Sequence, residues 1–236
     1  MSDININVRV FPIDEPKGAT KAYASVSVDD LIAIRGIRVV EGEKGLFVAM
    51  PQSKDKEDNY HDIAFPITGD LRRGITALVI DEYDRVAALA PEDRGYSAQK
   101  ANMEAVKRAA DVLLDVKVYP IDDPQGSTKA FASVGVEDIV AIRGIRIVEG
   151  NKGIFVSMPQ SKDKDGDYHD IAFPMNGDLR REMNKAILSE FKGLDKSHDR
   201  KPSLAEGLKT GSEKAAAYAA VPRAAVAKSH GGGVLD

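Results

Sequence analysis

The sequence contains no cysteine, which excludes disulfide bonds, thiolate zinc sites and cysteine nucleophiles. Histidine is scarce, with four residues in the whole chain. No apolar run approaches the roughly 20 residues that a membrane-spanning helix needs. The start, MSDININVRV, lacks the basic and apolar blocks of a signal peptide. We therefore expect a cytoplasmic protein with no membrane partner.

Positive charge is not in excess either. The chain has 33 Lys and Arg against 37 Asp and Glu, a formal net charge of −4. A protein that attracts nucleic acid through its overall field is usually basic. Any nucleic-acid site in this chain must therefore be a local basic patch.

One domain sequence occurs twice in the chain. Residues 8–84 align without a gap onto residues 116–192, with about 48 of 77 positions identical. The run RGIRVVEGEKGLFVAMPQSKDK from Arg35 returns as RGIRIVEGNKGIFVSMPQSKDK from Arg143, and YHDIAFP occurs at Tyr60 and Tyr168. Chance does not produce such a match, so we predict two copies of one domain.

The first part of each copy alternates as β-strands do. In the first copy apolar and polar residues alternate over residues 4–10, which is typical of a strand with one wet face. Further strands are predicted near residues 22–28, 31–40, 46–50 and 60–64, with a polar loop at 52–59. Gly36 interrupts the third strand, which predicts a β-bulge.

The end of each copy has the period of a helix. We predict Asp70 as the N-cap in the first copy and Asp178 as its counterpart in the second. The apolar stripes that follow are Leu71, Ile75, Leu78, Val79 and Val86, and Leu179, Met183, Ile187 and Leu188. The predicted fold class is therefore α+β: two tandem small antiparallel β-sheet domains, each with a C-terminal helix.

Four regions are predicted along the chain: repeat 1 at 1–90, a helical linker at 91–111, repeat 2 at 112–194 and a flexible tail at 195–236. The linker helix is expected from Ser97 to about residue 110. The tail is low in complexity and predicted to be disordered. Because a unit of about 80 residues buries a limited core, we expect the repeats to pair as an intramolecular pseudo-dimer, with edge-strand pairing as one route.

The first copy contains IRVVEG, then KGLFVAMP, a polar loop and DIAFPI before a helix, and the second copy contains closely similar runs. Both copies resemble the core signature of the SpoVG septation-protein family. The resemblance implies small β-sheet domains that form dimers, and bacterial regulators of septation and sporulation that bind DNA and RNA. It also implies that basic residues in the loop after the VAMP strand and around the helix carry the binding. The chain departs from the family's adjacent Lys-Arg in that loop, since it has Ser53-Lys54 and Ser161-Lys162.

Two arginine pairs are the leading candidates for nucleic-acid binding: Arg72 with Arg73, and Arg180 with Arg181. Both pairs fall in a first helical turn, where the macrodipole disfavours cations. One hypothesis is that exposed amides and arginines together hold a phosphate. The alternative is a solvated pair bonded to nearby carboxylates such as Asp70.

Four loop lysines are further candidates for phosphate contact: Lys54, Lys56, Lys162 and Lys164. Their loops interleave acids, as in KDKED and KDKDGD, which is also typical of solvated surface. Arg38 and Arg146 match an arginine of the family's strand signature. We favour a structural role for them, paired with Glu41 and Glu149 respectively.

Other motifs are weaker candidates for a binding or catalytic role. Tyr60 and Tyr168 could stack a base, although packing in the core or on an edge is more typical at a strand start. The His-Asp dipeptides at 61–62 and 169–170 lack the further ligands that a metal site needs, so a surface pair is favoured. The acidic run at 163–167 does not fit a calcium loop. No catalytic or phosphate-loop motif occurs, so we expect neither an enzyme nor a cofactor.

The leading hypothesis is a non-enzymatic bacterial regulator, associated with septation and sporulation, that binds DNA or RNA through a basic surface shared by the repeats. The alternative is a protein-interaction module of cell division or regulation that does not bind nucleic acid. The net negative charge and the diluted basic loop favour that alternative.

Overall fold

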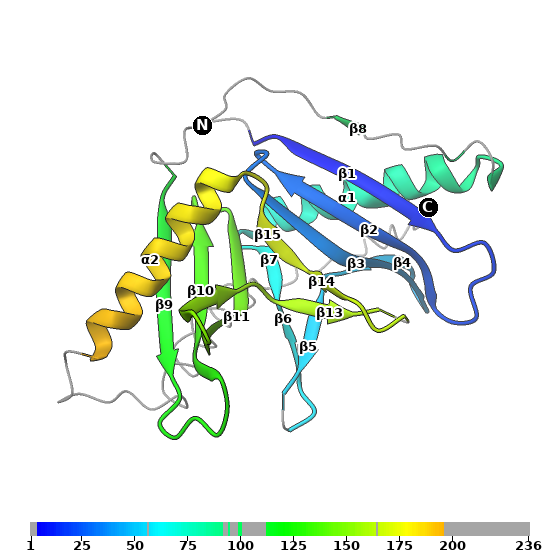
Figure 1. Cartoon of the computed structure of the whole chain (residues 1–236). Coiled ribbons are helices and arrows are strands. Elements are labelled where there is room, and N and C mark those ends of the chain that lie inside the picture. The colour runs from blue at the N-terminus through cyan, green and yellow to red at the C-terminus, as the bar shows by residue number, and fades with distance from the viewer. Residues whose placement is uncertain are drawn as a thin grey trace, which may run out of the picture. The chain divides into compact units, whose positions relative to one another are not determined.

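The computed structural model describes residues 4–55, 57–91, 94, 99–100, 112–163 and 165–195. The first repeat contains β1 (Ile6–Pro12), β2 (Thr20–Val28), β3 (Ile32–Gly42), β4 (Gly45–Ala49), β5 (Gln52–Lys54), β6 (Tyr60–Asp62), β7 (Ala64–Pro66) and α1 (Gly69–Ala87). The second contains β9 (Leu114–Pro120), β10 (Thr128–Val136), β11 (Val140–Gly150), β12 (Gly153–Ser157), β13 (Gln160–Lys162), β14 (Tyr168–Asp170), β15 (Ala172–Pro174) and α2 (Gly177–Asp195) (Figure 1). The predicted α+β class with two tandem domains is confirmed.

Each repeat forms an antiparallel sheet of long strands. In the first repeat β1, β2, β3 and β4 are neighbours in that order, and in the second β9, β10, β11 and β12 are. Alternate residues of these strands are buried, as the period-two pattern predicts. Gly36 has a φ of 74° at the point where the β2–β3 register shifts by one residue, and Gly144 has a φ of 71° at the equivalent point. The predicted bulge is therefore confirmed.

The segment after β4 differs from the prediction of a polar loop and one strand. Gln52–Lys54 and Tyr60–Asp62 pair as a separate two-stranded hairpin, β5–β6, and β13–β14 repeats it. The predicted fifth strand is divided, because Ile63 turns its side chain into the interior and β7 then begins at Ala64. Ile63 is 8% exposed, and its backbone amide donates to the Pro51 carbonyl at 2.8 Å.

The third strand of each repeat receives a strand from the other repeat. β15 pairs with β3, placing Ala172 opposite Ile34, and β7 pairs with β11, placing Ala64 opposite Ile142 (Figure 1). Backbone bonds extend the exchange in both directions: Arg35 N–H donates to the Ile171 carbonyl, and Arg143 N–H donates to the Ile63 carbonyl, each at 2.7 Å. The local sequence does not determine this pairing, because the exchanged strands are both Ala-Phe-Pro.

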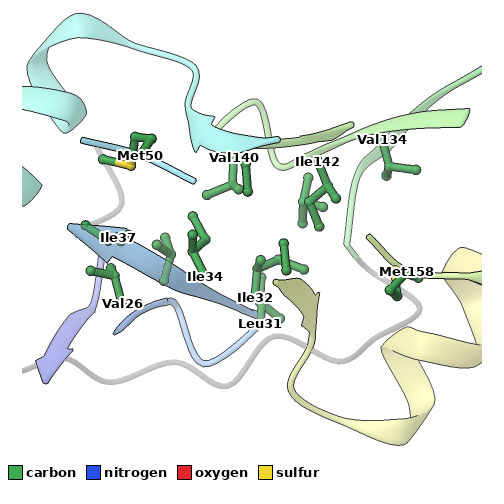
Figure 2. Close-up of a cluster of buried hydrophobic side chains, with 14 of the residues drawn as sticks. Val26, Leu31, Ile32, Ile34, Ile37, Met50, Val134, Val140, Ile142 and Met158 are labelled. Atoms are coloured by element: carbon green, nitrogen blue, oxygen red, sulfur yellow. The ribbon is translucent and has the colours of Figure 1, made fainter. Parts of the chain in front are cut away.

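Side chains from both repeats form one buried cluster. Figure 2 shows Ile32 and Ile34 of β3 on one side and Val140 and Ile142 of β11 on the other. All four are 2% exposed or less. At about 1.5–3 kcal/mol for a fully buried aliphatic side chain, burial across this contact contributes substantially to holding the repeats together.

The helix caps differ from the prediction. Thr68, and not Asp70, is the N-cap of α1, because its side-chain oxygen accepts from Leu71 N–H at 3.3 Å. At α2, Asn176 accepts from Leu179 N–H at 2.6 Å. Asp70 and Asp178 lie in the first turn, where a carboxylate still complements the positive end of the macrodipole.

The linker also differs from the prediction where the structure describes it. Gln99 and Lys100 form a short strand, β8, on the free edge of β1, so these two residues are not helical. The rest of the predicted linker helix, and the predicted disordered tail after α2, lie outside the described residues. Neither helix of the described chain is long and apolar enough to cross a membrane.

Candidate nucleic-acid interface

The β5–β6 hairpin places a carboxylate at the centre of its loop. Asp55 accepts hydrogen bonds from the Glu57 and Asn59 backbone amides at 2.8 and 2.9 Å. Its other oxygen lies 2.7 Å from His61 Nε2. The bond to His61, followed by the Asn59 amide, lowers the pKa of Asp55 to about 2. The acid that the sequence places among the lysines therefore organises the loop.

The second hairpin repeats this arrangement. His169 Nε2 lies 2.7 Å from Asp163, which accepts from the Asp165 and Asp167 amides. The bond to His169 is the main cause that lowers the pKa of Asp163. Both histidines thus pair with a carboxylate six residues earlier and not with the adjacent aspartate. No group of three or more potential metal ligands occurs among the described residues.

Each hairpin is joined to the start of the following helix. Arg72 donates from Nη2 to Asp62 Oδ2 at 2.6 Å, and Asp62 also accepts from Gln52 Nε2 at 2.9 Å. In the second repeat Arg180 donates to Asp170 at 3.0 Å. The structure therefore brings the predicted helical arginine and the predicted lysine loop together within each repeat. The partner, Asp62, is ten residues from Arg72, and no helical periodicity in the sequence relates the two.

The second arginine of each pair is also bonded to a carboxylate. Arg73 pairs with Asp70, and Arg181 pairs with Asp178, both three residues apart and exposed. All four predicted arginines are thus bonded to carboxylates, as the alternative hypothesis expected, although Asp70 was the one partner it named. Binding of a phosphate by these arginines remains a prediction.

The loop lysines differ between the repeats. Lys54 Nζ lies 2.8 Å from Asp58, whereas the position equivalent to Asp58 in the second repeat is Gly166. Lys162 consequently has no ion pair within the described chain. Lys56 and Lys164 lie outside the described residues.

Tyr60 and Tyr168 are exposed and contact these lysines. Each tyrosine is 64% exposed, and the Lys54 and Lys162 amines lie 5.4 and 5.6 Å from the respective ring centroids. The prediction that these tyrosines pack in the core is therefore wrong, and they lie on the hairpin strands beside the lysines instead. A ring and an ammonium group side by side on a hairpin form a contact of the cation–π type.

The pairing predicted for Arg38 and Arg146 is also wrong. Glu41 pairs with Lys21 at 2.7 Å, and Glu149 pairs with Lys129 at 2.8 Å. Arg146 instead donates to Ser157 Oγ at 3.3 Å. Neither arginine has a carboxylate partner within the described chain.

Comparison with known proteins agrees with the duplicated fold. The family model SpoVG matches residues 4–85 and again residues 112–193, which together make up more than two thirds of the chain. The first match runs from β1 into α1, and the second match runs from β9 into α2.

Three relatives illustrate the extent of the similarity, and each carries the name septation protein SpoVG. The Myxococcus xanthus protein is 42% identical over 34% of this chain and 78% of its own length. The Caldanaerobacter subterraneus protein is 35% identical over 38% of this chain and 97% of its own length, and the Staphylococcus aureus protein is 35% identical over 35% and 82%. A relative therefore corresponds to one repeat. The chain belongs to the SpoVG family and contains its domain twice.

Proposed function

We propose that the protein acts in septation or its regulation and binds DNA or RNA as an intramolecular pseudo-dimer. The septation role follows from the names of its relatives. The observation that carries the proposal is the reciprocal exchange of β7 and β15, in which each repeat gives and receives the same strand contact. Such a contact is the intramolecular counterpart of an isologous dimer interface. It supplies two copies of every candidate cation in one compact unit.

The carboxylate partners do not prevent the arginines from binding phosphate. Arg72 is 44% exposed at its side chain, and Arg73 is 76% exposed. Exposed ion pairs contribute only about 0–1 kcal/mol, so a phosphate can replace the carboxylate at small cost. A guanidinium group has five N–H donors, which leaves donors for a phosphate beside those bonded to aspartate.

Binding measured as a function of salt tests the proposal. Fluorescence anisotropy with labelled DNA and RNA should give an affinity that falls with a log–log slope of about −3 to −4 if about four phosphates are contacted. The variant Arg72→Ala, Arg73→Ala, Arg180→Ala, Arg181→Ala should weaken binding and flatten the slope. A matched control removes four exposed cations elsewhere: Lys17, Lys44, Lys152 and Lys192. Equal losses in the two variants would contradict a local site.

A protein-interaction function remains the second candidate. It is favoured by the carboxylate partners of all four arginines and of Lys54, which lower the net charge of the site. No binding of DNA or RNA by the purified wild-type chain at about 50 mM salt would decide for this second function.

A further inference from the structure

The outer face of the first sheet, which is its side away from α1, is rich in rings and arginines. Helix α1 covers the inner face, because Ile75 and Val79 belong to the same buried cluster as Val8. The positions that alternate with the buried ones in β1–β4 point outward. Six of them are Arg9, Phe11, Tyr23, Arg35, Arg38 and Phe47.

Three of these residues form a row across the strands. Phe11 lies opposite Tyr23, and Tyr23 lies opposite Arg38. Side chains in directly opposite positions of a sheet are about 4.5–5.5 Å apart at Cβ and touch one another. Phe11 is 48% exposed and Tyr23 is 50% exposed, so each ring leaves about half of its surface to the solvent.

The second repeat has the same row with its two ring types exchanged. Tyr119 lies opposite Phe131, and Phe131 lies opposite Arg146. Phe131 is 39% exposed. The shared property is an aromatic ring beside an aromatic ring beside a guanidinium group.

The charge of the first outer face differs from that of the whole chain. Within the described chain Arg9 and Arg38 have no carboxylate partner, and Arg35 contacts the ring of Phe173. The other outward positions of β1–β4 hold neutral residues and Lys21, which pairs with Glu41 at the edge. Glu41, at the end of β3, is the one acid in these four strands, and Lys21 neutralises it. On a chain of net charge −4, this face is positively charged.

Exposed rings beside arginines that have no carboxylate partner in the described chain fit one kind of occupant. Bases of a single strand stack on aromatic side chains, while cations beside the rings contact the phosphates. The bases of a duplex are already stacked and do not offer their faces to a flat sheet. A protein partner would be favoured by a more continuous apolar surface than this mixture of rings and guanidinium groups.

We infer that the outer face of each sheet is a stacking platform for a single strand of nucleic acid, with the rows Phe11–Tyr23–Arg38 and Tyr119–Phe131–Arg146 at its centre. This inference rests on the proposed function and adds to it a substrate class and a second surface, apart from the hairpins and helix starts. The first face is the stronger of the two. The second includes Asp115 beside Lys117, where the first has Asn7 and Arg9.

Anisotropy with two probes tests the inference on the full chain. The probes are a labelled thymidine oligonucleotide of about 16 nucleotides and a duplex of the same length. The double variant Tyr23→Ala, Phe131→Ala should weaken binding of the single strand by about tenfold or more, since each stacked base contributes substantially. Duplex binding should change by less than about twofold, because the variant removes no charge.

The chain itself offers the matched control. Tyr23→Phe and Phe131→Tyr exchange the rings that the two repeats already use, so they keep stacking and should keep wild-type affinity. Single-strand binding that is unchanged in the alanine variant, while the wild type binds, overturns this inference alone. Failure of the wild type to bind either probe overturns the proposed function as well.

A second measurement reports stacking directly. The chain has no tryptophan, so Tyr23→Trp introduces a single indole on the platform. Its fluorescence should be quenched when the thymidine oligonucleotide is added and unchanged when the duplex is added at equal occupancy. A tryptophan that does not respond to a bound single strand overturns the inference.

Discussion

Arg35 of the first repeat lies over the ring of Phe173 of the second, with its guanidinium carbon 4.8 Å from the ring centroid. Arg143 and Phe65 repeat the contact with the repeats reversed, at 4.7 Å. Each phenylalanine is the middle residue of an exchanged strand. The contacts therefore report directly on the exchange that joins the repeats.

Removal of these two rings should destabilise the whole folded unit. The double variant Phe65→Ala, Phe173→Ala should lower the free energy of unfolding by about 2–4 kcal/mol. Truncation of one fully buried phenylalanine to alanine costs about 3–5 kcal/mol, and these two rings are only partly buried. Urea unfolding followed by circular dichroism measures the loss.

Phe11→Ala, Phe131→Ala is the matched control for stability. These rings lie on the outer faces, and exposed cross-strand contacts contribute about 0.2–1 kcal/mol each. A loss in the control as large as that in the first variant would show that the exchanged strands have no special role.

Separating the repeats should convert the internal exchange into a dimer. The exchanged strands are identical, and the receiving segments, Ile32-Ala33-Ile34 and Val140-Ala141-Ile142, differ only at their first residue. An isolated repeat, residues 4–90 or 112–195, should therefore pair with a second copy of itself. Light scattering after size-exclusion chromatography should give twice the mass of one repeat. A stable monomer would contradict the expected exchange.

Because the two exchanged strands have the same sequence, Ala-Phe-Pro, the sequence predicts the strands but not which strand each one pairs with. Alternation in residues 4–10 and 22–28 determines which face of each strand is buried, and Gly36 marks the bulge, because these are local properties. The strand that follows Ile63 is β7, and it pairs with β11 and not with β3. Which of these two strands it joins depends on the path of the chain between the hairpin and the sheet. Two equally suitable edges leave the local sequence with no preference.

The candidate site was predictable to a similar degree. The arginine pairs and the lysine loops could be located, because charge and position in a helix are visible in the sequence. The carboxylates that neutralise the arginines could not all be predicted, since Asp62 reaches Arg72 only after the hairpin folds back. The outer-face row was missed because Phe11, Tyr23 and Arg38 become neighbours only when the register of β1–β3 is known.

The helix caps provide a test of local stability. Thr68→Ala should destabilise the protein by about 0.5–2 kcal/mol, because it removes the oxygen that accepts from Leu71 N–H. Asp70→Ala should cost less, about 0.3–1 kcal/mol, since it removes a first-turn charge and an exposed ion pair with Arg73 that contributes little. Thermal unfolding of the two variants compares them. A larger loss at Asp70 would restore the assignment of that residue as the N-cap.

The hairpin loop should respond to acid between pH 4 and 2. Asp55 has its pKa lowered from 3.8 to about 2, so its bonds are fully present above pH 3.8 and are lost as the pH falls through the lower value. The Glu57 and Asn59 amides, which donate to Asp55, should report this midpoint in NMR spectra. His61→Ala removes the hydrogen bond that is the main cause of the lowered pKa, so the midpoint should move up toward 3.8. His169→Ala should leave the Asp55 midpoint unchanged and serves as the control.

Exchanging one residue between the two hairpins should alter both loop stability and nucleic-acid binding. Asp58 has a φ of 66°, a left-handed conformation that glycine adopts more readily, and its carboxylate pairs with Lys54. Asp58→Gly reproduces Gly166 of the second repeat and frees Lys54, so the salt slope of binding should steepen by about 0.9 for one added phosphate contact. Gly166→Asp should do the reverse by pairing Lys162. Unchanged slopes in both variants, with wild-type binding intact, would remove the loop lysines from the interface.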